Sequence, residues 1–432
     1  MYPLSEQVST QSRHFSSTQL KQIERRMNMK KFLASALSAA LLLSALAGCS
    51  GSGSGSASGS APAGSGASDG DKVVKIGVFE PASGDSASGG KKEMLGMQFA
   101  NSETPTVELG GETYQVELVY ADNGSSTDKA LTAATQLVSE GVSLVLGSYG
   151  SGVSIAAGPI FRDAGIPAMG VTCTNPNVTA GNDHYFRICF LDPFQGTVLA
   201  NFAHDELGAD TVYCLGQLGN DYDQGLMNYF KQAAEELGMT CIQESFPKNN
   251  SDFTSYMTTA KNEGADVIFA PTSISYAQLI VEQAYSQGVN VPLLGPDTWD
   301  SNMVLAAAQG KDMDVYVSTF YAEGGDTEFE AGFKEFINSD SDNLNNNGGN
   351  DIIAAVSAMG YDAYYVALEA LKLAGSTDPA AVMAALPQVT YTGVTGDIAF
   401  DDIGDAIRDT AYIKVADTAN NAWTLETVQT VE

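Results

Sequence analysis

The chain has 432 residues, with 52 Asp or Glu against 21 Lys or Arg and a formal net charge of −31 at pH 7. So acidic a surface argues against nucleic acid as a partner, because phosphates are bound by clustered Lys and Arg. The chain has three histidines and five cysteines without Cys-x₂-Cys spacing, so we expect neither a metal nor a cofactor.

The N-terminal segment has the features of a secretory signal. Two lysines precede an apolar run, residues 32–46, that is too short to span a bilayer. The Leu-Ala-Gly-Cys motif at 46–49 resembles the lipobox of bacterial lipoproteins, which implies a lipid on Cys49. A buried apolar helix that ends in cysteine is the alternative. Residues 1–26 fit no part of a signal peptide, so we expect the start codon to lie downstream, next to the lysines.

The segment after Cys49 is almost entirely Gly, Ser and Ala. This composition cannot bury apolar surface and predicts a flexible tether. We therefore assign residues 1–48 to an upstream extension and signal peptide, and residues 49–70 to the lipidated cysteine and its tether. The protein is expected to lie on the extracytoplasmic face of the cell membrane, held by its lipid. Roughly 360 residues then remain, enough for two domains.

From residue 71 on, apolar strand-like runs alternate with segments of helical period. This β-α order predicts parallel sheets, and the nearly continuous apolar strands indicate sheets covered by helices on both faces. We therefore predict an α/β fold of two Rossmann-like domains with parallel sheets. The expected strands are 73–79, 115–121, 143–147, 166–171, 211–216, 240–246, 266–270, 291–295 and 315–320.

Helical patterns and breaks in the alternation suggest how the chain divides into lobes. Residues 98–102, 128–139 and 152–163 are expected to lie in the first three helices, and the stretch 351–386 is helix-rich. The Asn- and Gly-rich residues 343–350 predict a solvated loop. Domain crossings are expected near 185–193, 320–323 and 389. The predicted N-terminal lobe is 71–192 plus 322–388, and the predicted C-terminal lobe is 193–321 plus 389–432.

Four cysteines follow the tether: Cys173, Cys189, Cys214 and Cys241. Disulfides are allowed outside the cytoplasm. Four cysteines permit three pairings, and the sequence does not choose among them.

A series of short motifs follows in a fixed order from Val73 to the end of the chain. They are Ile76–Val78 with Pro81–Gly84, Asp122–Asn123, Leu146–Ser151, Ala164–Pro167, Cys173–Pro176, Asn220–Tyr222, Leu294–Asp297 and Gly393–Asp401. Together they resemble the Leu/Ile/Val-binding family of ABC-transporter solute-binding proteins. The resemblance implies the type I periplasmic-binding fold, with two lobes joined by three hinge crossings. It also implies a small-molecule ligand in the cleft, and an ABC permease and ATPase as partners.

Residues 148–154 end one predicted strand and open a helix, at the edge where open α/β sheets bind ligands. Unpaired N–H groups and a partial positive charge at the helix N-terminus suit a carboxylate. Ser151 matches the carboxylate-binding serine of the family and is expected to add a hydroxyl donor. Alternatively, Ser151 or Gly152 only caps the helix.

Thr172 and Thr174 follow the predicted strand 166–171. The resemblance implies that these two positions hold the ammonium and carboxylate of a bound amino acid. A Ser/Thr turn before Asn175 is the alternative.

Asp297 follows the predicted strand 291–295. In the family, an acid at this place pairs with the ligand's α-ammonium, and a charge-assisted hydrogen bond is the natural way to hold a desolvated ammonium. The alternative role is N-cap of a helix that begins near Ser301, a role that Asp300 also suits.

Other site residues are implied by the resemblance. Tyr222 matches a tyrosine that closes over the ligand, although a tyrosine early in a helix also serves packing. Ser86 stands where the family often has an aromatic wall residue, which admits polar or smaller ligands. Ser273 and Tyr276 follow the strand 266–270 and are candidates for the opposite wall.

Common catalytic motifs are missing from the sequence: Gly-x-Ser-x-Gly, the phosphate-binding Gly-x₄-Gly-Lys loop and His-Glu-x-x-His. We therefore expect no enzyme. We expect a monomeric solute-binding lipoprotein of an ABC importer that binds an amino acid, of the branched-chain type before others, by flytrap closure. The alternatives are a ligand-sensing subunit of a signalling system, a structural surface lipoprotein, and a binder of a non-amino-acid small carboxylate or amide.

Overall fold

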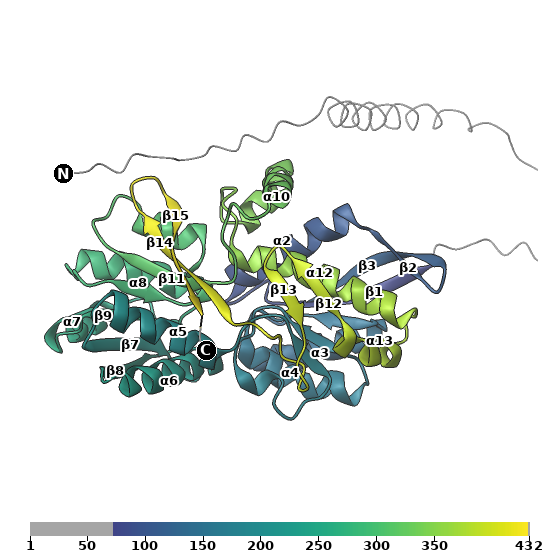
Figure 1. The fold of residues 1–432 in the computed structure, drawn as a ribbon, viewed down its shortest axis with the longest axis horizontal. Helices are drawn as coiled ribbons and strands as arrows, with labels where there is room; N and C mark the ends of the chain where they lie inside the picture. The colour runs from purple at the N-terminus through teal and green to yellow at the C-terminus, as the bar shows by residue number, and fades with distance from the viewer. Residues whose placement is uncertain (1–71, 431–432) are drawn as a thin grey trace, which may run out of the picture. The chain divides into compact units, whose positions relative to one another are not determined.

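The computed structural model describes residues 72–430 (Figure 1). The predicted signal peptide, the lipidated Cys49 and the tether lie outside these residues. In the part of the chain that is described, no helix is both long and apolar enough to cross a bilayer.

The first sheet has six strands in the order β2-β3-β1-β4-β5-β6. All neighbours are parallel except β2, which forms an antiparallel hairpin with β3. β4 and β5 are wholly buried, as expected for strands covered on both faces. The strands are β1 (Val73–Glu80), β2 (Thr106–Leu109), β3 (Glu112–Asp122), β4 (Leu144–Leu146), β5 (Ala168–Gly170) and β6 (Tyr185–Arg187).

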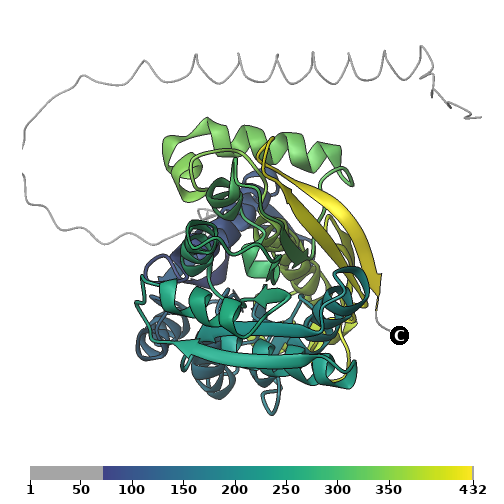
Figure 2. The ribbon, with the colours of Figure 1, turned by 90° about the vertical axis from the view of Figure 1, so that its left-hand side faces the viewer.

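The second sheet has seven strands in the order β15-β14-β11-β10-β9-β7-β8. Its core is parallel, and the ribbon β14–β15 adds two antiparallel strands at one edge, seen in yellow in Figure 2. The strands are β7 (Thr211–Gln217), β8 (Thr240–Phe246), β9 (Val267–Phe269), β10 (Leu293–Gly295), β11 (Val315–Thr319), β14 (Thr410–Asp417) and β15 (Ala422–Thr430). The predicted α/β fold with two parallel-dominated sheets is confirmed, and every strand expected from the sequence overlaps an observed one.

Helices alternate with the strands. The helices α2 (Ala87–Glu103), α3 (Thr127–Glu140), α4 (Ser151–Asp163), α10 (Thr327–Ser339), α11 (Ser341–Asn346), α12 (Ala355–Ala374) and α13 (Pro379–Ala385) belong with the first sheet, and we call this part the first lobe. The second lobe is the second sheet with α5 (Asp192–Asn201), α6 (Asp221–Glu236), α7 (Thr254–Asn262), α8 (Ile274–Ser286) and α9 (Asn302–Ala308).

α2 and α12 pack closely because a glycine of each helix lies against the backbone of the other. A Cβ at Gly96 would lie 1.9 Å from the carbonyl oxygen of Ser357, and one at Gly360 would lie 2.2 Å from that of Glu93. Any side chain there would push the helices apart. This close packing fixes the position of Glu93, which matters for the site below.

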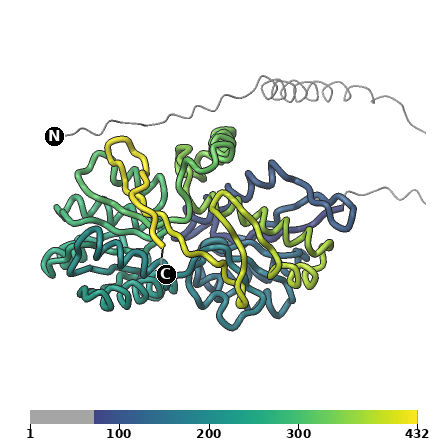
Figure 3. Tube along the Cα trace, in the orientation of Figure 1, coloured from purple at the N-terminus to yellow at the C-terminus, as the bar shows by residue number. Residues whose placement is uncertain are grey.

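The chain passes between the lobes three times: between β6 and α5, between β11 and α10, and between β13 and β14 (Figure 3). The last passage follows a hairpin of β12 (Thr390–Gly393) and β13 (Gly396–Ala399). Asp362 of α12 holds this hairpin on the first lobe by accepting hydrogen bonds from the backbone of Val394 and from both N–H and hydroxyl of Thr395. The predicted domain boundaries stay a prediction; the last of them, near 389, precedes this hairpin, whereas the passage between the lobes follows it.

Residues 98–102 lie in α2, as expected, and one local prediction differs from the structure. The solvated loop expected at 343–350 contains α11, and Asn347 is fully buried. Its side-chain amide donates to the backbone oxygens of Asn350 and Ile352, so this polar segment is internally hydrogen-bonded.

Candidate ligand-binding site

A cavity of about 250 Å³ lies between the two lobes. Ligand pockets for drug-sized molecules run from about 300 to 1,000 Å³, so this cavity suits a small solute. Four of the predicted residues line it: Ser86, Ser151, Tyr222 and Ser273. The other three, Thr172, Thr174 and Asp297, are not among the lining residues and are almost fully buried.

Ser151 is the first residue of α4, and the cavity opens onto this helix end. The N-cap is Gly150, and no side chain caps the helix. The Ser151 hydroxyl instead accepts a hydrogen bond from the N–H of Asn175 at 3.3 Å. The capping alternative for Ser151 and Gly152 is therefore wrong. The first N–H groups of α4 and their partial positive charge remain available to an anion such as a carboxylate.

Thr172 lies on the first lobe, and its hydroxyl donates to Oε1 of Glu93 on α2. Glu93 is fully buried, which raises the pKa of its carboxyl to about 7. The turn into the short helix Pro176–Val178 is made by Asn175, whose side chain accepts from the N–H of Asn177, so the Ser/Thr-turn alternative for Thr172 is wrong.

Thr174 is fully buried where the chain leaves the first lobe. Its backbone oxygen accepts from the N–H of Asp192, the first residue of α5, at 3.0 Å. Asp192 is also fully buried, and burial raises the pKa of its carboxyl to about 7. Thr174 thus lies next to Asp192, a second buried acid, at the start of α5, where the chain enters the second lobe.

Asp297 approaches the site from the second lobe, in the short helix that follows β10. Its Oδ1 accepts hydrogen bonds from Nε2 of Gln195 (2.9 Å) and from the hydroxyl of Tyr222 (2.8 Å). Its Oδ2 is buried and has no hydrogen-bond partner among the described residues. Burial raises the pKa of the carboxyl to about 6.

The helix-capping alternative for Asp297 is wrong. α9 is capped by Ser301, whose hydroxyl accepts from the N–H of Met303 at 3.2 Å. Asp300 does not cap it either, because its Oδ2 forms a buried ion pair with Lys414 at 2.9 Å. Asp297 is thus left with one oxygen free to receive a hydrogen bond from elsewhere.

Direct contacts join the two lobes around the cavity. The Nδ2 of Asn175 donates to the backbone oxygen of Asp221 at 2.8 Å. At the rim, Lys248 lies 3.4 Å from the carboxylate of Asp85, and the hydroxyl of Ser275 donates to the backbone oxygen of Asp85 at 3.0 Å. These contacts hold the lobes together over the cavity, which is a closed arrangement.

Comparison with known proteins decides the family. Residues 73–420 match the sequence model of the family described as "Periplasmic binding protein". The chain belongs to that family. Leu/Ile/Val-binding protein homolog 2 of Brucella abortus is 28% identical over 340 residues, covering 77% of this chain and 87% of that protein. Members of the family bind solutes for ABC transporters and are not enzymes. The expectation of a non-enzymatic solute-binding protein is therefore confirmed.

Solved structures agree with the fold of this periplasmic binding protein. A leucine-binding protein of Thermotoga maritima is 30% identical with a TM-score of 0.73, covering 83% of this chain and 99% of that one. A branched-chain amino acid binding protein of Streptococcus pneumoniae, solved with isoleucine, is 25% identical with a TM-score of 0.71, at 83% and 99% coverage. A benzoate complex from R. palustris, 19% identical with a TM-score of 0.70, at 82% and 96% coverage, shares the fold.

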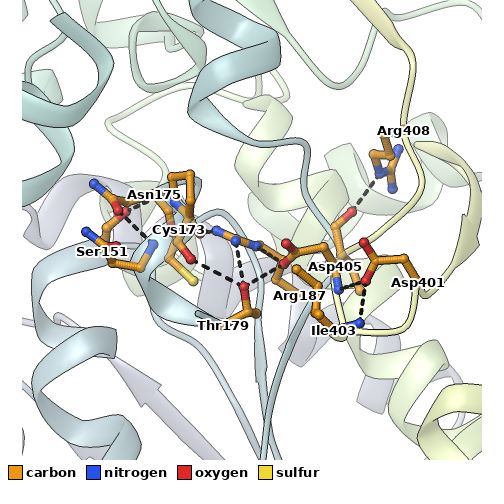
Figure 4. A network of polar contacts seen from close by, with 12 residues as sticks. Ser151, Cys173, Asn175, Thr179, Arg187, Asp401, Ile403, Asp405 and Arg408 are labelled. Atoms are coloured by element: carbon orange, nitrogen blue, oxygen red, sulfur yellow. Dashed lines mark hydrogen bonds and ion pairs between the residues drawn. The ribbon is translucent and has the colours of Figure 1, made fainter. Parts of the chain in front are cut away.

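Behind the site of this periplasmic binding protein, a buried arginine holds the loop that carries Thr172 and Thr174 (Figure 4). The Nε of Arg187 lies 2.5 Å from Oδ1 of Asp405, and its Nη1 donates to the backbone oxygens of Cys173 (3.0 Å) and Asn175 (2.6 Å). The Arg187–Asp405 pair spans the first lobe and the segment that leads to β14. It therefore positions the loop and ties it to the last crossing.

Four residues at the site were not predicted from the sequence: Glu93, Tyr149, Gln195 and Asp223. Glu93 follows two lysines in the sequence and so looks like part of a solvated charge run. Gln195 lies a turn into α5, away from any strand end, and reaches Asp297 only through the tertiary fold. Tyr149 lies inside the motif Leu146–Ser151, two positions before the predicted Ser151, and this place was the signal available for it.

Proposed function

We propose that this protein is an extracytoplasmic solute-binding lipoprotein that delivers an amino acid to an ABC importer. The observation that carries the proposal is the free, buried Oδ2 of Asp297 on one lobe, with the open N-terminus of α4 on the other. One group suits an ammonium and the other a carboxylate, the two charges that every α-amino acid carries.

In the proposed complex, Ser151 and the first N–H groups of α4 hold the ligand's carboxylate, with Thr172 and Thr174 beside it. Asp297 pairs with the α-ammonium, and Tyr222 closes over the ligand while keeping its bond to Asp297. Ser86 and Ser273 line the cavity toward the ligand's side chain. Branched-chain amino acids are the first class to test, because the Brucella relatives are named for Leu, Ile and Val.

Closure of the lobes would signal occupancy to the transporter. Ligand bound between the lobes favours the closed arrangement, because only that arrangement brings Asp297 and the α4 N-terminus to the same molecule. The proposed partners are an ABC permease and ATPase, with a monomer as the working form. The lipid on Cys49 would keep the protein at the membrane.

The proposal predicts a thermal shift with α-amino acids. Ligand that binds only the folded state raises the melting temperature by mass action, with about 2.7 kcal/mol of added stability at 100 times Kd. The screen uses the full set of L-amino acids, with benzoate and acetamide as small ligands that lack an ammonium. A shift with some amino acids and none with those two supports the proposal. A shift only with ligands that lack the ammonium would contradict it.

Affinity is also expected to depend on pH. Asp297 has a pKa of about 6 because it is buried, so it is ionised above that pH and can pair with an ammonium. As the pH falls through 6 the carboxyl takes up a proton that the ligand must displace, and affinity should fall by up to about tenfold per pH unit. Calorimetric titrations from pH 8 to pH 5 check this. Glu93 titrates near pH 7, so the difference between wild type and Asp297→Asn isolates the contribution of Asp297. Equal pH profiles of the two proteins would contradict the assignment.

A further inference from the structure

The ring of Tyr149 fills a space that exists only because residue 89 is glycine. A Cβ at Gly89 of α2 would lie 2.3 Å from both Cε2 and Cζ of Tyr149, an impossible contact. The ring also packs with Ala354 and Val356. The phenol is therefore held in one place, and Tyr149 lines the cavity.

The hydroxyl of Tyr149 is buried and has no hydrogen-bond partner among the described residues. Buried polar groups are nearly always paired, so an unpaired one in a ligand cavity points to a partner on the ligand. Burial and the charges of Asp297, Glu93 and Asp223 raise the pKa of the phenol far above its usual value. It therefore stays protonated and offers an O–H donor.

A second unpaired group lines the same cavity. Asp223 lies in the first turn of α6, and its Oδ2 accepts from the N–H of Gln217 at 2.7 Å. Its Oδ1 is buried and has no partner in the described part of the chain. A carboxyl oxygen keeps the capacity to accept a hydrogen bond even where, as here, burial raises the pKa of the group.

The other walls of the cavity are also mainly polar. Besides the phenol and the carboxyl, side chains with hydroxyl or amide groups line it, namely Ser86, Asn123, Ser125, Ser126, Thr127, Ser151, Gln217, Asn220, Tyr222, Ser273 and Thr298. A branched aliphatic side chain would have Pro81, Val153 and Leu218 as its aliphatic neighbours and would leave Tyr149 and Asp223 unpaired. The chemistry of the walls thus favours a ligand with its own donor and acceptor.

Building on the proposed amino-acid function, we propose that the cavity selects amino acids with a side-chain carboxamide. The amide oxygen accepts from the hydroxyl of Tyr149, and the amide NH₂ donates to Oδ1 of Asp223. Tyr149 is then a specificity-determining residue, made possible by Gly89. The inference narrows the ligand from amino acids in general to the asparagine and glutamine type, in place of the branched-chain type.

Calorimetric titration with near-isosteric pairs tests this. Asparagine is compared with leucine, and glutamine with methionine, on wild type, Tyr149→Phe and Asp223→Asn. Wild type should prefer the amide in at least one pair by about 10- to 100-fold, because two hydrogen bonds are at stake. Tyr149→Phe should reduce that preference to less than about threefold, mainly by lowering the affinity for asparagine or glutamine. Tyr285→Phe, at an exposed tyrosine outside the cavity, should leave it unchanged.

The two proposals fail in different ways. If neither amide binds wild type more tightly than its aliphatic partner, or if Tyr149→Phe leaves the preference intact, the carboxamide inference is overturned while amino-acid binding stands. If none of the four amino acids binds, the carboxamide inference is overturned, and the thermal screen with the full set of L-amino acids decides whether amino-acid binding is overturned as well. Tyr149→Phe only removes an unpaired hydroxyl, so an unchanged or higher melting temperature shows that the variant is folded. Asp223→Asn replaces the acceptor Oδ1 by a donor and should also abolish the preference.

Discussion

Replacing Asp297 by asparagine should weaken amino-acid binding by at least about 30-fold and by up to several thousand-fold. Loss of one member of a buried, hydrogen-bonded charge pair costs about 2–5 kcal/mol, and each 1.4 kcal/mol is tenfold in Kd. The asparagine Oδ1 can still accept from Gln195 and Tyr222, so the architecture is kept. The change places an NH₂ group where Oδ2 stood. This donor then faces the ligand's ammonium, which is also a donor, so no hydrogen bond forms between them. Calorimetric titration of both proteins with the strongest ligand of the thermal screen measures the effect.

A matched control removes the same charge from an exposed place on the same lobe. Glu263 is exposed at the end of α7, and Glu263→Gln should change Kd by less than about twofold, because exposed charges are screened by solvent and salt. If Asp297→Asn binds within threefold of wild type, Asp297 does not hold the ammonium. The site would then need another acid, and Glu93 would be the next to test.

Arg187→Met should lower the free energy of unfolding by about 3–5 kcal/mol, the cost of leaving one member of a buried ion pair without its partner. The side chain of Arg187 is 0% exposed and that of Asp405 is 4% exposed. The substitution also removes the donors that hold the backbone of Cys173 and Asn175. We therefore expect amino-acid affinity to fall together with stability. Urea denaturation followed by circular dichroism measures the first effect.

Arg162→Met is the matched control, because Arg162 pairs with Asp163 at the surface, where the two side chains are 40% and 72% exposed. Exposed ion pairs contribute little, so this variant should stay within about 1 kcal/mol of wild type. A loss of less than about 1 kcal/mol for Arg187→Met as well would show that the buried pair does not stabilise the fold.

Much of the fold followed from local sequence pattern. The buried parallel strands β4 and β9 are short and apolar, and such runs are visible without tertiary information. The hairpin β12–β13 was missed because Asp362, far away in the sequence, fixes it on α12. The buried Asn347 was missed for a similar reason, since its backbone oxygen accepts from Lys92 and Asn302 on other elements.

The candidate site divides along the same line. Ser151 and Asp297 each follow a parallel strand, one in each sheet, and ligands of such sheets bind beyond the carboxyl ends of the strands, so the place of both residues was predictable. Tyr149 and Asp223 matter because each has a buried oxygen without a hydrogen-bond partner among the described residues, which only the packed structure reveals. The glycine that admits Tyr149 lies 60 positions earlier, on another element, and no local pattern connects the two.

The central claim is that the cleft binds an α-amino acid through both of its charges. The most direct test is calorimetric titration of wild type with the strongest amino-acid ligand and with the same molecule lacking its α-ammonium, such as glutamine against 4-carbamoylbutanoate or leucine against 4-methylpentanoate. Our account predicts that the amino acid binds and that the analogue binds at least about 30-fold more weakly. Equal affinity for the two would contradict it.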